Sequence, residues 1–345
     1  MLRKHWRVSD PWRVRAQVIA ALLVLAVCGF GAAPASAEAI KVGTTKLSST
    51  APLFIAIDKG YLAAEGLAAE VVIFDAAQPV SMGVTSGDLD FGVTAVSGAF
   101  YSLAAAGSQK IIAGTVRDAP GFQQYAFVVA KNAYDAGLKS YKDLNGHSVA
   151  VVQVGGPIHY TLALFEEKFK LDAKTIRPVP LQTVSNQVSA VTGGTTDAGI
   201  IPVTAVAGSL ARGDMKSLGT TGDEVQWQIG AVFASTKTLA EQPDRVARFL
   251  RAYSKAVRDY HDAFIGEGEK RKNGPGADEL LAIIAKNLGQ TVAQVEPALP
   301  YIDPKMRLDV KDIQHQLDWY TSQGMLKSEI KAEAVIDKSH VVPLP

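Results

Sequence analysis

The sequence predicts an α/β protein built from two similar lobes, and three observations lead to this prediction. Runs of β-branched and apolar residues alternate with helix-like segments as far as Ser235, which is typical of parallel sheets. The middle of the chain repeats the order of elements at its start, and after Thr236 only helices follow. We therefore expect lobe I to comprise residues 38–120 and 226–345, including the C-terminal helices, and lobe II to comprise residues 121–225.

The first 37 residues are set apart from these lobes. An apolar run, Val18–Phe30, follows a basic head and precedes Ala35-Ser36-Ala37, the small-x-small pattern of a cleavage site. The run is too short for an ordinary membrane span. We therefore predict a cleavable signal peptide and a periplasmic location, with an uncleaved anchor as the alternative. The basic residues are Arg3, Lys4, Arg7, Arg13 and Arg15.

Cys28 is the only cysteine, and it lies inside this apolar run. Val27 before it fits a lipoprotein signal poorly, so lipidation of Cys28 is the less favoured alternative. The mature chain then has no disulfide, no thiol nucleophile and no thiolate metal ligand. These properties fit an exported bacterial protein whose large core makes disulfides unnecessary.

Strands and helices follow from the hydrophobic pattern. Pro243–Phe264 has apolar residues at a 3.6-residue period, which predicts a long helix. The other expected helices after residue 236 are Ala277–Leu288, Val292–Leu299 and Val310–Gln323. The expected strands are Ile40–Thr44, Ala69–Phe74, Leu89–Thr94, Lys110–Thr115, Tyr125–Ala130, Ser148–Gln153, Ile176–Pro180, Ala198–Pro202, Lys216–Gly219 and Ile229–Ser235.

Residues 40–94 and residues 149–202 form an internal repeat. In each segment a strand leads through a loop of small residues into a helix, and then come a strand, a helix and a third strand. Two crossings between the lobes are expected, near Arg117–Gln124 and Asp223–Ile229, and together they would form a hinge. We expect the helical tail to pack back on lobe I.

Composition and motifs exclude several classes of function. The chain has 345 residues, 48% of them hydrophobic, and a formal charge of +1. This is enough for a large core and gives no basic surface for nucleic acid. The sequence has no dinucleotide, P-loop, zincin or nucleophile-elbow motif. Its histidines lack metal-ligand spacing. We therefore expect no catalytic residues, no metal and no cofactor.

Four loops share one plan, in which a strand ends, small or polar residues follow and a helix begins. Ligands of open α/β sheets bind beyond the carboxyl ends of the strands, where helix N-termini offer N–H groups and partial positive charge. In any one loop the hydroxyl groups are explained equally well as helix caps. The convergence of all four loops on one cleft favours a binding site. The expected ligand-binding residues are Lys46, Ser48, Ser49, Thr50, Val96, Ser97, Gly155, Gly156, His159, Pro202, Val203 and Thr204.

Charged or ionisable candidates are few. His159 begins the helix after Gly155-Gly156, where it either contacts the ligand or has a structural role. Lys46 and Arg117 are the nearest cations for an acidic ligand. For a lone cation, however, a solvated surface position is the simpler interpretation.

The run from Pro52 to Leu67 closely resembles the P-x-x-x-A-x-x-K-G-Y-F-x-x-E-G-L motif of one family. This family is the periplasmic substrate-binding proteins of nitrate, sulfonate and taurine ABC importers, which also includes binders of thiamine-pyrimidine precursors. Further segments agree with the family, in order, over almost all of the mature chain. They are Ser86–Gly92, Asp143–Val151, Gly155–Tyr160, Gly193–Ala198 and Pro243–Ala252.

The resemblance implies a type II-like periplasmic binding protein fold, with a hinge of two crossings and the ligand between the lobes. Pro202-Val203-Thr204 departs from the acidic-proline pair that many relatives have there, and Ala95-Val96-Ser97 carries small apolar and hydroxyl groups. The identity of the ligand therefore stays open. A small organic anion, such as a sulfonate, a carboxylate or an aromatic acid, is favoured over nitrate.

By the same resemblance, the protein is expected to be a monomer that delivers its ligand to a membrane permease served by a separate ATPase subunit. One alternative is a protein related to pyrimidine precursors, either a binder or an enzyme of the fungal pyrimidine-synthase type. The enzyme uses a cysteine-rich motif, which the mature chain lacks. Another alternative is a periplasmic sensor that presents its ligand to a membrane receptor, and the sequence alone separates sensor from importer poorly.

Overall fold

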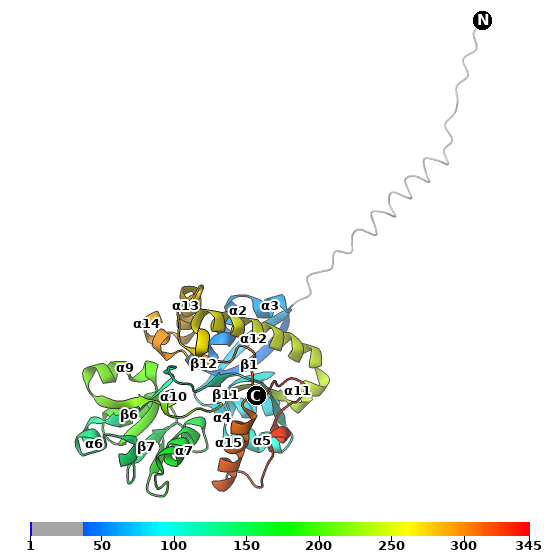
Figure 1. Cartoon of the computed structure of the whole chain (residues 1–345). Helices are drawn as coiled ribbons and strands as arrows, with labels where there is room; N and C mark the ends of the chain where they lie inside the picture. Colours follow the sequence, from blue (N-terminus) through cyan, green and yellow to red (C-terminus); the bar gives the residue numbers. More distant parts are fainter. Residues whose placement is uncertain (2–36) are drawn as a thin grey trace. The chain divides into compact units, whose positions relative to one another are not determined.

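The computed structural model describes Met1 and residues 37–345. The chain divides into two units, Met1–Ala37 and Glu38–Pro345. Residues 2–36, which include Cys28 and all of the predicted signal peptide except its first and last residues, lie outside the described residues. Glu38–Pro345 is built around two five-stranded sheets with helices between the strands (Figure 1). Within the described residues, no helix combines the length and the hydrophobicity that a membrane span requires.

The two sheets take their strands from different parts of the chain. The first sheet has the order β2-β1-β3-β11-β4 and the second the order β10-β6-β9-β7-β8. The strands of the first sheet are β1 Glu38–Thr45, β2 Leu67–Phe74, β3 Phe91–Ala95, β4 Gln109–Gly114 and β11 Gly230–Ser235. Those of the second are β6 Tyr125–Ala130, β7 Ser148–Val151, β8 Arg177–Pro180, β9 Ala198–Pro202 and β10 Met215–Thr220.

Both sheets have the same topology, so the internal repeat seen in the sequence is present in the structure. Strand β7 corresponds to β1, with β8 and β9 paired parallel to it as β2 and β3 are paired to β1. The prediction of wholly parallel sheets was wrong for one strand in each, because β6 and β11 run antiparallel to their neighbours. Each is the first sheet strand after a crossing, so the chain enters the new sheet at the carboxyl edge and must run backwards.

The helices lie where alternation predicts them, and α12 and α13 have the predicted bounds. The helices before β11 are α2 Ala51–Asp58, α3 Tyr61–Ala64, α4 Ala77–Ser86, α5 Gly98–Ala105, α6 Lys131–Asp135, α7 Pro157–Phe169, α8 Val184–Thr192, α9 Val203–Arg212 and α10 Thr221–Glu224. Those after it are α11 Thr236–Glu241, α12 Pro243–Phe264, α13 Ala277–Leu288, α14 Val292–Val295, α15 Val310–Ser322 and α16 Ala332–Val335. The expected helix over residues 292–299 continues beyond α14 as a 3₁₀ turn, Glu296–Ala298.

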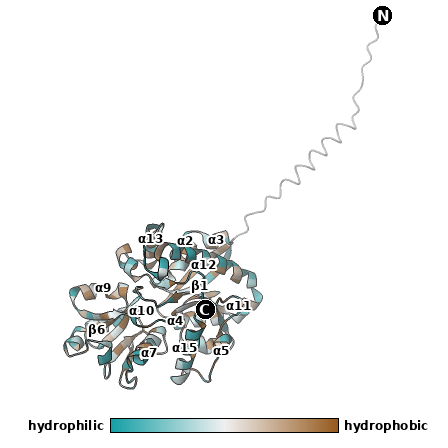
Figure 2. Cartoon of the chain, viewed as in Figure 1, coloured by the Kyte–Doolittle hydropathy of each residue, from teal (hydrophilic) through white to brown (hydrophobic). Residues whose placement is uncertain are grey.

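Helices cover both faces of the first sheet. Phe91 on β3 stacks on Phe249 of α12, with ring centroids 4.1 Å apart. The next residue, Gly92, faces the opposite side, where a Cβ would lie 2.3 Å from Phe233 of β11. The Phe233 ring in turn packs against Phe100 of α5 at 4.9 Å. Hydrophobic residues accordingly gather on the strands, while the covering helices alternate between hydrophobic and hydrophilic positions (Figure 2).

The C-terminal helices contact more than the first sheet. Helix α12 packs on α2 and α3, as a tail returning to lobe I predicts. Helix α15, however, also contacts α7, a helix that follows a strand of the second sheet. Gln316 accepts a hydrogen bond from Tyr101 of α5 at 2.9 Å, and Asp312 accepts one from Tyr160 of α7 at 3.1 Å. The expectation that the tail packs on one lobe alone was therefore incomplete.

The chain passes between the sheets after β5 (Val116–Arg117) and again after β10. A buried carboxylate, that of Asp118, ties the two passages together. It accepts hydrogen bonds from Thr221 Oγ1 at 2.9 Å and Trp227 Nε1 at 3.1 Å. Burial raises the pKa of Asp118 to about 7, against the lowering effect of these two donors. That these passages act as a hinge, and that the lobes divide at residues 120 and 225, stays a prediction.

Candidate functional site

A cavity of about 220 Å³ lies between the two sheets. Its walls follow the carboxyl ends of β1, β2 and β3 on one side and of β7, β8 and β9 on the other. Tyr125 also lines it because β6 begins at this edge, opposite Pro202 at the end of β9. The lining residues are Thr45, Lys46, Leu47, Phe74, Asp75, Ala76, Ala77, Thr94, Ala95, Tyr125, Val152, Gln153, Gly156, Pro157, Ile158, Thr183, Val184, Ser185, Gln187 and Pro202.

Four helices begin at the wall of this cavity. They are α4, α7, α8 and α9, and the cavity-lining residues Ala77, Pro157, Val184 and Pro202 stand at their first or capping positions. Only α8 among them has a side-chain cap, in which Thr183 accepts from the Asn186 amide. The other three helices leave N–H groups without a capping side chain. Each N-terminus adds partial positive charge, so together they favour a bound anion.

The charged side chains of the wall contribute little net charge. Lys46 and Asp75 are the only ionisable side chains, apart from the Tyr125 phenol, among the described residues that line the cavity, and both are largely exposed. The Lys46 ammonium lies 3.3 Å from where a Cβ on Gly289 would be, beside the loop after α13.

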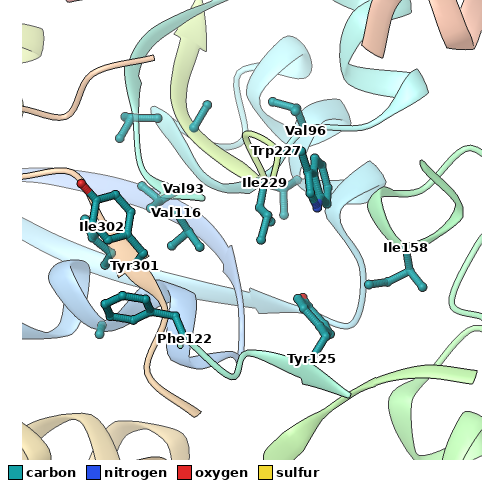
Figure 3. Close-up of a cluster of buried hydrophobic side chains, with 14 of the residues drawn as sticks. Val93, Val96, Val116, Phe122, Tyr125, Ile158, Trp227, Ile229, Tyr301 and Ile302 are labelled. Atoms are coloured by element: carbon teal, nitrogen blue, oxygen red, sulfur yellow. The ribbon is translucent and has the colours of Figure 1, made fainter. Parts of the chain in front are cut away.

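Apolar side chains supply much of the remaining wall, apart from the uncharged polar residues Thr45, Thr94, Gln153, Thr183, Ser185 and Gln187. Ile158 and Tyr125 are 6% and 5% exposed, and Figure 3 shows them facing each other across a gap. Phe74, Val152 and Val184 extend this surface. The cavity therefore combines an apolar surface with the positive field of the N-termini of α4, α7, α8 and α9. This combination suits a ligand with an organic skeleton and an anionic group.

Three of the predicted binding residues line the cavity, namely Lys46, Gly156 and Pro202. A fourth, Ser49, lines a smaller hollow that shares part of the same wall.

Four predicted residues support the fold instead of lining the cavity. Ser48 donates to the Ala298 carbonyl at 2.7 Å, and Thr50 donates to the Thr45 carbonyl at 2.8 Å. Ser97 caps α5 by accepting from the Phe100 amide, and Val96 is fully buried. None of the four lines the cavity. The hydroxyl groups of Ser48, Thr50 and Ser97 therefore have the structural role that was the alternative to ligand binding.

Gly155, His159, Val203 and Thr204 lie next to cavity residues but outside the wall. The Gly155 amide donates to Nδ1 of His159 at 3.1 Å, which fixes that nitrogen as the acceptor. The imidazole also packs edge-on against Trp319 of α15, and burial lowers its pKa. His159 therefore holds the loop before α7 in place. Arg117, the other cation considered, lies 3.9 Å from Asp309 and not at the cavity.

The sequence pattern missed three parts of the wall: Phe74–Ala77, Thr183–Gln187 and Tyr125. The first two follow the same plan of a strand end and a helix start, at the ends of β2 and β8. Ala76 caps α4 without any side-chain hydrogen bond, so a search guided by hydroxyl caps passes over it. Tyr125 was missed because it begins a strand rather than ending one.

The end of the Pro52–Leu67 motif lies against α12 instead of the cavity. Lys59 pairs with Asp259 at 3.1 Å, and Tyr61 also donates to Asp259. Glu65 pairs with Arg251 at 2.7 Å. These residues fasten α2 and α3 to α12 and do not line the cavity, so their role is structural.

The described residues offer no site for a metal ion. Among residues 37–345, no group of three or more His, Cys, Asp and Glu side chains is placed to hold one. The site is therefore described by its helix starts and its apolar wall.

A family model described as "NMT1/THI5 like" matches residues 48–263, which is more than half of the chain. The chain belongs to the NMT1/THI5-like family. Comparison with curated protein sequences finds no significant match.

Solved structures resemble this NMT1/THI5-like protein over most of its length. One is the alkanesulfonate-binding protein SsuA from Xanthomonas axonopodis bound to MOPS, with a TM-score of 0.67, 18% identity and coverage of 89% of this chain and 99% of that one. Another is the periplasmic nitrate-binding protein NrtA from Synechocystis, with a TM-score of 0.65, 16% identity and coverage of 87% and 85%. A Candida albicans protein described as having the generic periplasmic binding protein fold has a TM-score of 0.68, 16% identity and coverage of 89% and 98%. These likenesses show that the chain has the periplasmic binding protein fold.

Proposed function

We propose that this protein is the periplasmic solute-binding component of an ABC importer and that it captures a small organic anion. The observation that carries the proposal is the cavity between the two sheets, bordered by the starts of four helices. The predicted signal peptide, the family and the sulfonate- and nitrate-binding structures that share the fold support it. No catalytic role is proposed.

The size of the cavity favours an organic anion over nitrate. An apolar cavity of roughly 150 Å³ holds benzene, and this one measures about 220 Å³. Nitrate has only four heavy atoms and would leave Ile158, Tyr125 and Phe74 without a partner. A sulfonate, carboxylate or aromatic acid would fill the apolar part and place its charge at the helix N-termini.

The mechanism follows from the two walls. A ligand that touches residues of both sheets gains all its contacts only when the sheets stand as they do here. Binding would therefore shift any open–closed equilibrium toward the closed form. The closed, loaded protein would deliver its ligand to the permease, and a separate ATPase subunit would supply the energy.

A thermal-shift screen tests the proposal. The panel holds alkanesulfonates, benzenesulfonate, benzoate, nitrate and a pyrimidine. A ligand at 100 times its Kd should stabilise the protein by about 2.7 kcal/mol, which raises the Tm of a chain of this size by roughly 4 °C. We expect an organic anion to do so. A shift with nitrate or the pyrimidine alone would reject the ligand class, and turnover of any panel member would reject the binding-protein role.

Substitution of Lys46 tests whether its ammonium interacts with the anionic group of the ligand. If its ammonium turns toward the bound anion, Lys46→Gln should raise the Kd about tenfold, since a hydrogen bond to a charged group contributes roughly 1.5 kcal/mol. Lys41→Gln is the matched control, because Lys41 is exposed on β1, the strand that ends just before Lys46, and lies outside the cavity wall. Equal effects of the two substitutions would show that general charge, and not the site, governs affinity.

Measuring uptake of the ligand by cells separates the importer role from the sensor role. Cells that lack this protein should lose uptake of the labelled compound that raises its Tm. Retained uptake with a lost transcriptional response would favour the sensor.

A further inference from the structure

A smaller hollow of about 10 Å³ adjoins the cavity on the side of β11. The two spaces share five wall residues, which makes the hollow an annex of the cavity. Its volume is about that needed for one water-sized group. The annex is lined by Thr45, Leu47, Ser49, Val93, Thr94, Ala95, Thr115, Tyr125, Ile229 and Gly230.

Two hydroxyl groups without a partner among the described residues line the annex, those of Thr115 and Tyr125. Thr115 and Tyr125 are 3% and 5% exposed, and within residues 37–345 neither hydroxyl makes a hydrogen bond. Figure 3 shows the hydroxyl end of Tyr125 turned toward Ile229, another annex residue. Neither oxygen is among the fully enclosed side-chain atoms without a partner, so each still faces open space. These two groups can therefore form hydrogen bonds to a polar group inside the annex.

The annex is polar but uncharged. Its remaining hydroxyls are those of Ser49 and of Thr45 and Thr94, whose oxygens lie 3.3 Å apart. No Lys, Arg, His, Asp or Glu is among its lining residues. An ammonium or carboxylate placed there would lose its hydration without a counter-charge. A neutral group that both donates and accepts hydrogen bonds fits the annex better.

Gly230 keeps the annex open. A Cβ at this position would lie 2.5 Å from Thr115 Oγ1 and 3.4 Å from the Thr94 carbonyl oxygen. Any side chain would therefore displace the Thr115 hydroxyl or fill the space in front of it.

We propose that the annex receives a hydroxyl group of the ligand, so that the natural ligand is a hydroxylated organic anion with its charge at the helix starts. This inference rests on the proposed function and makes the ligand class narrower. A site built to hydrogen-bond a substrate hydroxyl discriminates strongly against the analogue that lacks it. The competing occupant is a bound water, which would serve hydroxylated and plain ligands alike.

Matched pairs of probes test the inference by titration calorimetry. The pairs are 4-hydroxybenzenesulfonate and benzenesulfonate, 4-hydroxybenzoate and benzoate, and 2-hydroxyethanesulfonate and ethanesulfonate. In at least one pair the hydroxylated member should bind about tenfold or more tightly than its parent. Gly230→Ala, which fills the annex, and Thr115→Val, which removes one hydroxyl at constant shape, should each bring the ratio of the two affinities toward one.

Thr321→Val is the control, because the Thr321 hydroxyl bonds the Leu317 carbonyl of its own helix at 2.8 Å; it should keep the preference. Equal binding within every pair would refute the annex as a hydroxyl site and leave the importer proposal standing. A preference for the hydroxylated probe that survives Gly230→Ala would do the same. If no probe binds at all, the proposed function fails and the annex fails with it.

Discussion

Asp118→Asn should change how the stability of this protein depends on pH. The Asp118 side chain is buried between the two crossings and accepts hydrogen bonds from Thr221 and Trp227 through one oxygen. Asparagine can accept the same two bonds, and it cannot ionise. The substitution therefore removes the titration while keeping the shape of the site.

The sign and size of the effect follow from the pKa values. Burial raises the pKa of Asp118 from 3.8 to about 7. Well below pH 3.8 the folded and unfolded states both hold the proton. As the pH rises from 4 to 7, only the unfolded state releases it, so the free energy of unfolding falls, and above pH 7 the loss is complete. The difference between the two pKa values corresponds to roughly 4 kcal/mol.

Urea unfolding of the wild type and of Asp118→Asn at pH 4, 6 and 8 measures this effect. The variant should gain stability relative to the wild type by roughly 4 kcal/mol between pH 4 and pH 8. Any fixed cost of the new amide group cancels in this comparison. Asp262→Asn, whose side chain is 83% exposed, should show no such trend. A difference between Asp118→Asn and the wild type that does not vary with pH would refute the reasoning.

Two further predictions concern packing between distant segments. Arg245→Met should lower the free energy of unfolding by roughly 1–2 kcal/mol, because the guanidinium joins Glu38 and Asp90. Arg258→Met, which loses a solvent-exposed hydrogen bond to Ser254, should cost under about 0.5 kcal/mol. Equal costs in urea unfolding would contradict the ion-pair account. Tyr160→Phe should lower the free energy of unfolding by roughly 1–2 kcal/mol, because the Tyr160 hydroxyl bonds the Asp312 carboxylate and the His315 imidazole of α15. An unchanged midpoint of urea unfolding would show that these hydrogen bonds do not stabilise the packing of α15.

Much of the fold was predictable because it depends on local pattern. The 3.6-residue stripe set the bounds of α12, and the repeat predicted the common topology of the sheets. The direction of β6 and β11 was not predictable from alternation, since it depends on where the crossing delivers the chain. The contact of α15 with α7 was missed as well, because its polar contacts to Tyr160 leave no mark in hydrophobic periodicity.

The site was predictable only in part, for a physical reason. Strand ends located Lys46, Gly156 and Pro202 at the cavity, because the carboxyl edge of a sheet is set by topology. Which side chain of a loop points inward is set by packing, and Ser48 turned out to bond a carbonyl in a distant segment, that of Ala298. Hydroxyl residues cap helices and bind ligands equally well, so residue type alone does not separate the two roles.

The central claim is that a small organic anion occupies the cavity between the two sheets. The most direct test is calorimetric titration of the best ligand of the panel into the wild type and into Ala76→Trp. Ala76 lines the cavity with extended backbone, so tryptophan there can fill the space from the first-sheet side. The account predicts one ligand per chain, loss of binding in the variant and an unchanged Tm without ligand. Undiminished binding to Ala76→Trp would contradict it by placing the ligand elsewhere.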